Sequence, residues 1–212
     1  MTLANIIDNV AKWAQAEICD GMQLKMPDDD VNDGGYPGEL ITPVAFACFA
    51  PAKDRLPPGV RAPIPSICVQ IVDGKDDLLT GKRTASVRLN IAAWNPGVHG
   101  SEKMIPIADA TQFGGRRYLK VQSEEDKAAF QRNMDGWRDA WGFADRALSA
   151  LENTEFIAGL RLVKEAPDGI KYGPYKQDEQ IWDYYPYWFL WIEFDLEAGL
   201  VHRVPDAYKN LL

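Results

Sequence analysis

The chain reads Ser66-Ile67-Cys68-Val69-Gln70-Ile71-Val72 and, after a charged stretch, Thr84-Ala85-Ser86-Val87-Arg88-Leu89-Asn90-Ile91-Ala92-Ala93-Trp94. The second run alternates between apolar and polar residues, which places Ala85, Val87, Leu89, Ile91 and Ala93 on one face. A period of two is typical of an antiparallel strand with one buried face. The two runs therefore predict a hairpin with a charged tip at residues 73–83.

Two segments outside this hairpin have helical periodicity. Apolar residues recur every three or four positions in residues 2–18, where Thr2 is placed to cap the N-terminus. Residues 123–153 carry a longer stripe, made of Phe130, Met134, Trp137, Trp141, Ala144, Leu148 and Leu151. Because the stripe contains tryptophans and glycines lie at 136 and 142, packing on a sheet is favoured over a coiled-coil seam.

Three more strands are predicted, at residues 39–49, 159–165 and 187–198. The last one has a continuous apolar face, made of Trp188, Leu190, Ile192, Phe194 and Leu196. We therefore expect residues 1–212 to form one α+β domain of the broad α/β class. Its mostly antiparallel sheet is packed by the N-terminal helix and one long amphipathic helix, with extended loop insertions at 26–65 and 96–125.

The composition narrows the function classes. A formal net charge of −8 and a pI near 4.8 argue against a general nucleic-acid-binding surface. Cys19, Cys48 and Cys68 are scattered and odd in number, which is typical of reduced thiols. The sequence lacks a signal-peptide pattern and any apolar run of membrane-spanning length, so a soluble intracellular protein is expected.

The acidic segment resembles a calcium-binding loop in spacing. Asp28, Asp30, Asn32 and Glu39 occupy ligand positions of such a loop, but Asp33 stands where the tight turn requires glycine. A solvated acidic loop is therefore the favoured interpretation.

Other chemical motifs fail on similar grounds. Around Gly81-Lys82-Arg83-Thr84, the spacing of a phosphate-binding loop is broken because Asp76 replaces its first glycine. The two histidines, His99 and His202, have no nearby ligand cluster in the sequence. We therefore predict no catalytic, cofactor-binding or metal site and expect the protein not to be an enzyme.

The hairpin tip and an aromatic segment are the candidate contact surfaces. The tip carries charges of both signs, which favour specific docking on another protein; they are Asp73, Lys75, Asp76, Asp77, Lys82 and Arg83. Residues 182–194 are rich in aromatics. A core strand is favoured there over a stacking platform, which leaves Tyr184 and Tyr185 as a candidate interface patch.

The order of the predicted elements resembles that of the tail terminator proteins of tailed bacteriophages. The resemblance is carried by Pro65-Ser66-Ile67-Cys68-Val69-Gln70-Ile71, Ala85-Ser86-Val87-Arg88-Leu89-Asn90-Ile91 and Tyr187-Trp188-Phe189-Leu190-Trp191-Ile192-Glu193-Phe194. It covers about two thirds of the chain and rests on segment character, not on a sharp motif.

This resemblance implies a virion protein of the tail or neck, assembled in the bacterial cytoplasm. Members form a hexameric ring on the last tail-tube ring, stop tube growth and receive the head connector. The implied partners are copies of itself, tail-tube proteins and head-connector proteins, with DNA passing through the lumen without specific binding. The alternatives are another neck or tail protein, such as a head-completion or tube protein, or a cytoplasmic ligand-binding or hydrolytic domain.

Overall fold

The computed structural model describes residues 2–27, 39–95, 136–165, 169–181 and 184–199. The helical elements are α1 (Leu3–Ala14), a π-helical turn (Gln15–Cys19), a 3-10 turn (Lys53–Arg55) and α3 (Trp137–Glu152). The strands are β1 (Leu24–Lys25), β2 (Leu40–Ile41), β3 (Val44–Ala47), β4 (Ser66–Asp77), β5 (Lys82–Trp94), β6 (Phe156–Ile157), β7 (Leu160–Val163), β8 (Lys171–Pro174), β9 (Lys176–Gln177), β10 (Gln180–Ile181) and β11 (Tyr187–Gly199).

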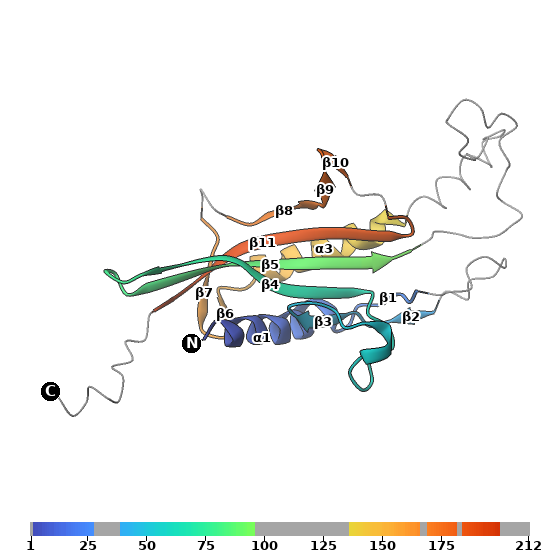
Figure 1. Cartoon of the computed structure of the whole chain (residues 1–212), viewed down its shortest axis with the longest axis horizontal. Coiled ribbons are helices and arrows are strands. Elements are labelled where there is room, and N and C mark those ends of the chain that lie inside the picture. Colours follow the sequence, from blue (N-terminus) through green and yellow to red (C-terminus); the bar gives the residue numbers. More distant parts are fainter. Residues whose placement is uncertain (1, 28–38, 96–135, 166–168, 182–183, 200–212) are drawn as a thin grey trace, which may run out of the picture.

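The main sheet has the order β3-β4-β5-β11-β7-β6, with β8 also paired to β11 (Figure 1). All of its pairings are antiparallel except that of β3 with β4. Three long strands form its centre, because β5 pairs along its length with β4 on one side and β11 on the other. The expected α+β fold with a mostly antiparallel sheet is confirmed.

The hairpin arms are longer than the sequence pattern indicated. β4 continues through the charged residues to Asp77 and β5 already begins at Lys82, so the turn contains only residues 78–81. The predicted tip at 73–83 is therefore too long, because the two strands extend into it from both sides. The register shifts between Ile71 and Asp73, so a bulge keeps the strands paired where the apolar alternation stops.

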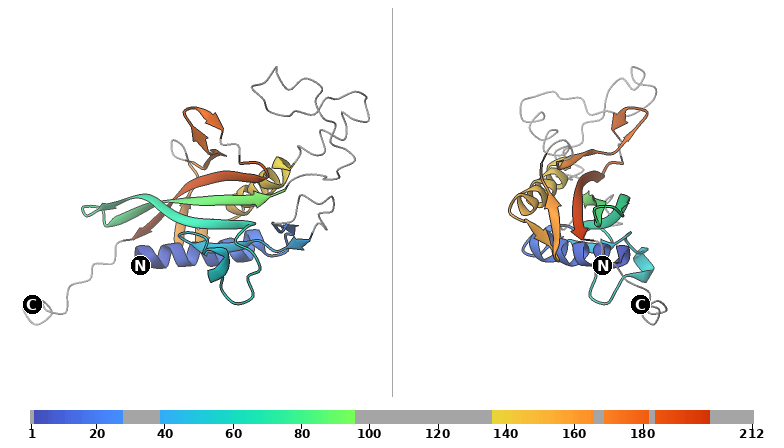
Figure 2. Two further views of the ribbon diagram at one scale, coloured as in Figure 1. Left: turned by 45° about the vertical axis from the view of Figure 1, so that its right-hand side comes forward. Right: turned by 90° about the vertical axis from the view of Figure 1, so that its left-hand side faces the viewer.

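Both helices cover the same face of the sheet (Figure 2). α1 lies against β3 and β4, and α3 lies against β5 and β11. The predicted apolar faces of the two central strands are confirmed as core; their buried members are Ala85, Val87, Leu89, Ile91, Ala93, Leu190, Ile192, Phe194 and Leu196. The opposite face of the sheet is therefore not covered by either helix.

Side-chain hydrogen bonds are formed at both ends of the N-terminal helical segment. Thr2 Oγ1 accepts a hydrogen bond from the Asn5 amide at 3.3 Å, which confirms the expected N-cap. At the other end, Arg146 of α3 donates to the Ile18 and Asp20 carbonyl oxygens at 2.6 and 2.7 Å. Ile18 belongs to the π-helical turn and Asp20 directly follows it, so Arg146 ties the end of the N-terminal helical segment to α3.

The buried face of α3 confirms Ala144 and Leu151 of the predicted stripe but is turned away from its tryptophans. Its buried residues are Ala140, Phe143, Ala144, Ala147 and Leu151. Trp137 is 39% exposed, and Trp141 lies only partly buried at the edge of the core. The alanines allow the helix to approach the sheet closely, and the bulky indoles fit at the rim of that contact. Packing on the sheet is confirmed, whereas residues 123–135 of the predicted helix lie outside the described residues.

Residues 39–65 are not a loop throughout. The predicted strand at 39–49 is divided into β2 and β3, because Pro43 between them has no amide hydrogen for a ladder. β3 then joins the main sheet, which corrects the interpretation of 26–65 as a loop insertion. Between the end of β3 and residue 65, the 3-10 turn is the only helix or strand. The 96–125 insertion lies outside the described residues.

Candidate assembly interface

The β4–β5 hairpin reaches well beyond the rest of the sheet. β3 pairs only with Ser66–Val69 of β4, and both helices end short of the hairpin turn (Figure 1). Within the described residues, the outer edge of β4 beyond this pairing has no neighbouring strand. Such an edge offers backbone hydrogen-bonding groups to another chain, and the charges at Asp73, Lys75 and Asp77 limit unspecific pairing.

The turn of the hairpin presents two leucines to solvent. Leu78 is 76% exposed and Leu79 is 100% exposed. Asp77 Oδ1 accepts hydrogen bonds from the Leu79 and Thr80 amides at 2.9 and 3.1 Å, and these bonds lower the pKa of Asp77. The turn is therefore held in one shape although it lies at the end of a long arm. Adjacent, highly exposed leucines on a turn are typical of a contact surface.

Two of the charged side chains on the hairpin form an ion pair with each other. Arg83 donates through Nε and a terminal nitrogen to both carboxylate oxygens of Asp76, each at 2.6 Å. These bonds lower the pKa of Asp76. Of the six predicted contact residues on the hairpin, Asp76 and Arg83 thus serve first to hold the two strands together.

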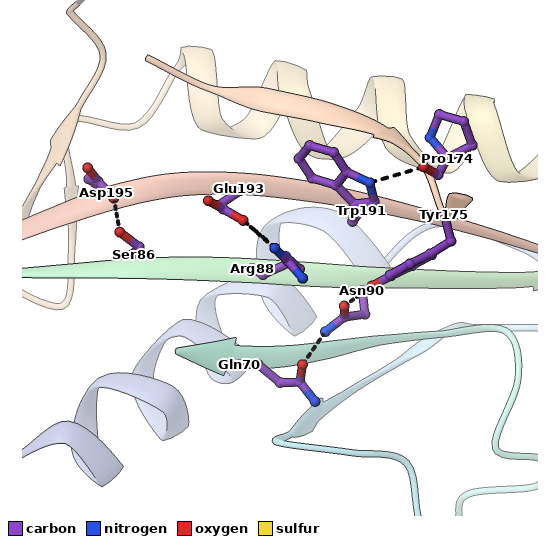
Figure 3. A network of polar contacts seen from close by, with 9 residues as sticks. All are labelled: Gln70, Ser86, Arg88, Asn90, Pro174, Tyr175, Trp191, Glu193 and Asp195. Carbon is purple, nitrogen blue, oxygen red and sulfur yellow. Dashed lines mark hydrogen bonds and ion pairs between the residues drawn. The ribbon is translucent and has the colours of Figure 1, made fainter. Parts of the chain in front are cut away.

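The sheet face away from the helices carries a network of polar contacts (Figure 3). Arg88 donates two hydrogen bonds to Glu193, at 3.0 and 2.8 Å, and Ser86 donates to Asp195 at 2.5 Å. The Arg88 guanidinium also lies 5.6 Å from the centre of the Trp191 ring. These acidic side chains are therefore paired across β5 and β11, which indicates a structural role.

An aromatic hollow lies on this same face, near the start of β11. It has a volume of about 680 Å³ and is lined by Ile64, Asn90, Tyr175, Tyr184, Tyr187 and Phe189. The rings of Tyr184 and Phe189 meet edge to face at 5.9 Å, and Tyr187 stacks on Phe189 at 6.5 Å. Because the lining residues that the structure describes carry no charge, the hollow suits an apolar occupant. We call this surface the aromatic hollow below.

Two polar side chains of the hollow, Tyr175 and Asn90, are hydrogen-bonded to each other. Tyr175, which directly follows β8, reaches over the sheet and donates its hydroxyl to Asn90 Oδ1 (Figure 3). The Asn90 amide nitrogen donates to the Cys68 carbonyl at 3.0 Å and to Gln70 Oε1 at 3.1 Å. Burial raises the pKa of the Tyr175 hydroxyl. Asn90 thus has a partner at both its oxygen and its nitrogen without any ligand.

The structure separates the two sets of predicted contact residues. The hairpin charges lie at one end of the central strands, and Tyr184 and Tyr185 lie at the other. The two tyrosines also differ in setting, because Tyr184 lines the aromatic hollow while Tyr185 packs edge to face on Trp188 at 6.2 Å. They therefore do not form one continuous patch.

Sequence reasoning did not single out the exposed leucines or most of the aromatic hollow. Two consecutive leucines between Asp77 and Thr80-Gly81 were a readable signal, because a turn is an unusual place for large apolar side chains. Ile64, Asn90 and Tyr175 carry no such signal. They meet only because the segment after β8 crosses the sheet.

The described residues do not bring together the side chains of a metal site. Among them, no group of three or more His, Cys, Asp or Glu side chains comes together as a metal site would require. Of the proposed calcium ligands only Glu39 is described, and it forms an ion pair with Arg61. Asp28, Asp30, Asn32, His99 and His202 lie outside the described residues. None of the helices in the described part of the chain has the length and apolar character needed to cross a membrane.

The three cysteines are free thiols in different settings, and this leads to a labelling prediction. Cys19 is fully buried, which raises its pKa to about 12, whereas Cys48 is exposed. Since the thiolate is the reactive form, we expect a thiol reagent at mildly alkaline pH to modify Cys48 first and to spare Cys19 until the protein unfolds. Mass spectrometry of labelled peptides measures this order. Labelling of native Cys19 as fast as Cys48 would contradict the buried site.

Comparison with known proteins gave no relative: no family model, no curated protein and no solved structure matches this chain.

Proposed function

We propose that this chain is a ring-forming structural protein of the tail terminator type, which caps a phage tail tube and joins it to the head connector. The observation that carries the proposal is the β4–β5 hairpin, whose fixed turn exposes Leu78 and Leu79 beyond the body of the fold. On this proposal the projecting arm contacts a different surface of its neighbour. Such a head-to-tail interface closes into a ring when the rotation between copies is favourable.

The charge of the chain supports a passage for DNA. Phosphate binding depends on cationic contacts, so a ring made of chains with a net charge of −8 would let a duplex slide through without holding it. On this proposal the protein acts by assembly on tail-tube and connector proteins in the virion, and it performs no reaction.

Native mass spectrometry combined with sedimentation over a range of concentrations tests the proposal. We expect a finite, concentration-dependent assembly, because subunits that close a ring cannot grow further. The resemblance to tail terminator proteins implies six copies. A strict monomer at all concentrations would overturn the proposal. If that monomer also gained thermal stability with a small ligand, a ligand-binding domain would be the better interpretation.

A further inference from the structure

The hairpin turn and the aromatic hollow are two apolar surfaces at opposite ends of the same three strands. Building on the proposed ring, we infer that the turn of one copy, with Leu78 and Leu79, inserts into the aromatic hollow of the next copy. The inference names the partner and the contact; the proposed function itself requires only that some head-to-tail contact exists.

The turn cannot reach the hollow of its own chain. Asn90 lines the hollow and Lys82 begins the same strand beside the turn. A strand rises by about 3.4 Å per residue, so the two positions are about 27 Å apart. Figure 1 shows β5 extended between these two ends. Any contact between the two surfaces therefore joins different molecules.

The chemistry of the hollow favours an apolar side chain over a polar ligand. A sugar or nucleotide would need unpaired donors and acceptors in the lining to select it. Asn90 instead holds Tyr175 through its oxygen and Cys68 and Gln70 through its nitrogen. Tyr184, Tyr187 and Phe189 supply ring surface, with which leucine makes good contact.

The turn also matches the hollow in charge and in rigidity. Leu78 and Leu79 lie between Asp77 and Lys82, whose charges are opposite, while Asp76 and Arg83 neutralise one another. Opposite charges that lie close together lose less solvation free energy than an unpaired charge when they approach an aromatic surface. Its hydrogen bonds to Asp77 fix the shape beforehand, which reduces the entropy lost on docking.

Disulfide trapping tests the contact directly. In a Cys48→Ser background, chains with Leu79→Cys are mixed with chains carrying Tyr184→Cys under mild oxidation by oxygen with a copper–phenanthroline catalyst. Two thiols then lose two electrons and two protons to oxygen and form one disulfide. We expect cross-linked dimers in the mixture and only background dimers when either variant is oxidised alone.

Assembly strength gives a second measurement. Leu78→Asp with Leu79→Asp should raise the dissociation constant of the assembly by about 100-fold or more, because burial of two leucines is lost. Leu40→Asp is the matched control: Leu40 is 53% exposed but lies on β2, outside both surfaces. It should leave the dissociation constant unchanged, and circular dichroism checks that every variant is folded.

The outcomes separate the two proposals. A hexamer that forms normally but gives no cross-link in the mixture, and that tolerates the two aspartates, would overturn the docking of the turn while leaving ring assembly intact. Absence of any assembly in the unmodified chain would overturn the proposed function itself. Cross-linking in the mixture together with loss of assembly in the aspartate variant would establish the docking of the turn and the head-to-tail assembly on which it rests.

Discussion

Replacing Gly136 with alanine should lower the free energy of unfolding by about 3 kcal/mol. A Cβ at this position would lie 2.0 Å from the Asn95 carbonyl oxygen and 3.0 Å from both the Asn95 carbonyl carbon and Trp188 Nε1. The first distance is far inside van der Waals contact and involves a main-chain atom. The side chain therefore cannot be accommodated by a simple rotamer change, and the backbone around Asn95 has to move.

Movement at Asn95 is costly because several elements meet there. Its carbonyl accepts from Trp188 Nε1 at 3.1 Å, and its side chain donates to Asp139 at 2.6 Å and accepts from Lys25 at 2.8 Å. Its amide donates to the Pro186 carbonyl at 3.0 Å. Since Asn95 is almost fully buried, groups that lose these bonds find little water to replace them.

Gly142 supplies the matched control within the same helix. A Cβ there meets nothing within 4 Å, and the position is exposed in the interior of α3. Gly142→Ala should therefore stabilise the protein by about 0.5–1 kcal/mol, since alanine has the higher helix propensity. Urea denaturation of both variants measures the difference. Equal effects of the two substitutions would contradict the close approach at Gly136.

Strand patterns were the most predictable part of this fold. The period-two alternation of β5 and β11 identified their buried faces correctly, because an antiparallel sheet with helices on one side forces this alternation on its central strands. The helix at the N-terminus and its Thr2 cap were readable for the same reason: the signal is local.

The surfaces proposed for assembly depend on long-range geometry. The aromatic hollow combines Ile64, Asn90, Tyr175 and the start of β11, which come together only through strand order and the path after β8. The spacing of these residues in the sequence does not predict that path. The sequence predicted the hairpin but not its full length. The residues at 73–77 are mostly charged and lack the apolar alternation of a strand, although β4 continues through them.

The orientation of α3 is the clearest case in which the sequence pattern was misleading. Large apolar residues dominate a periodic pattern, so the predicted buried face included Trp137 and Trp141. The structure instead centres the buried face on Phe143 and three alanines. Small side chains were favoured there because two packed layers approach most closely along the centre of their contact.

This orientation predicts a large effect at one aromatic residue of α3 and a small one at another. Phe143 is fully buried between the helix and the sheet, so Phe143→Ala should cost about 3–5 kcal/mol by opening a cavity. Trp137 is a larger residue, yet it remains 39% exposed, and Trp137→Ala should cost clearly less. Denaturant unfolding of the two variants compares them directly. A greater loss at Trp137 would restore the stripe expected from the sequence, because only a helix rotated toward the indoles would bury Trp137 more deeply than Phe143.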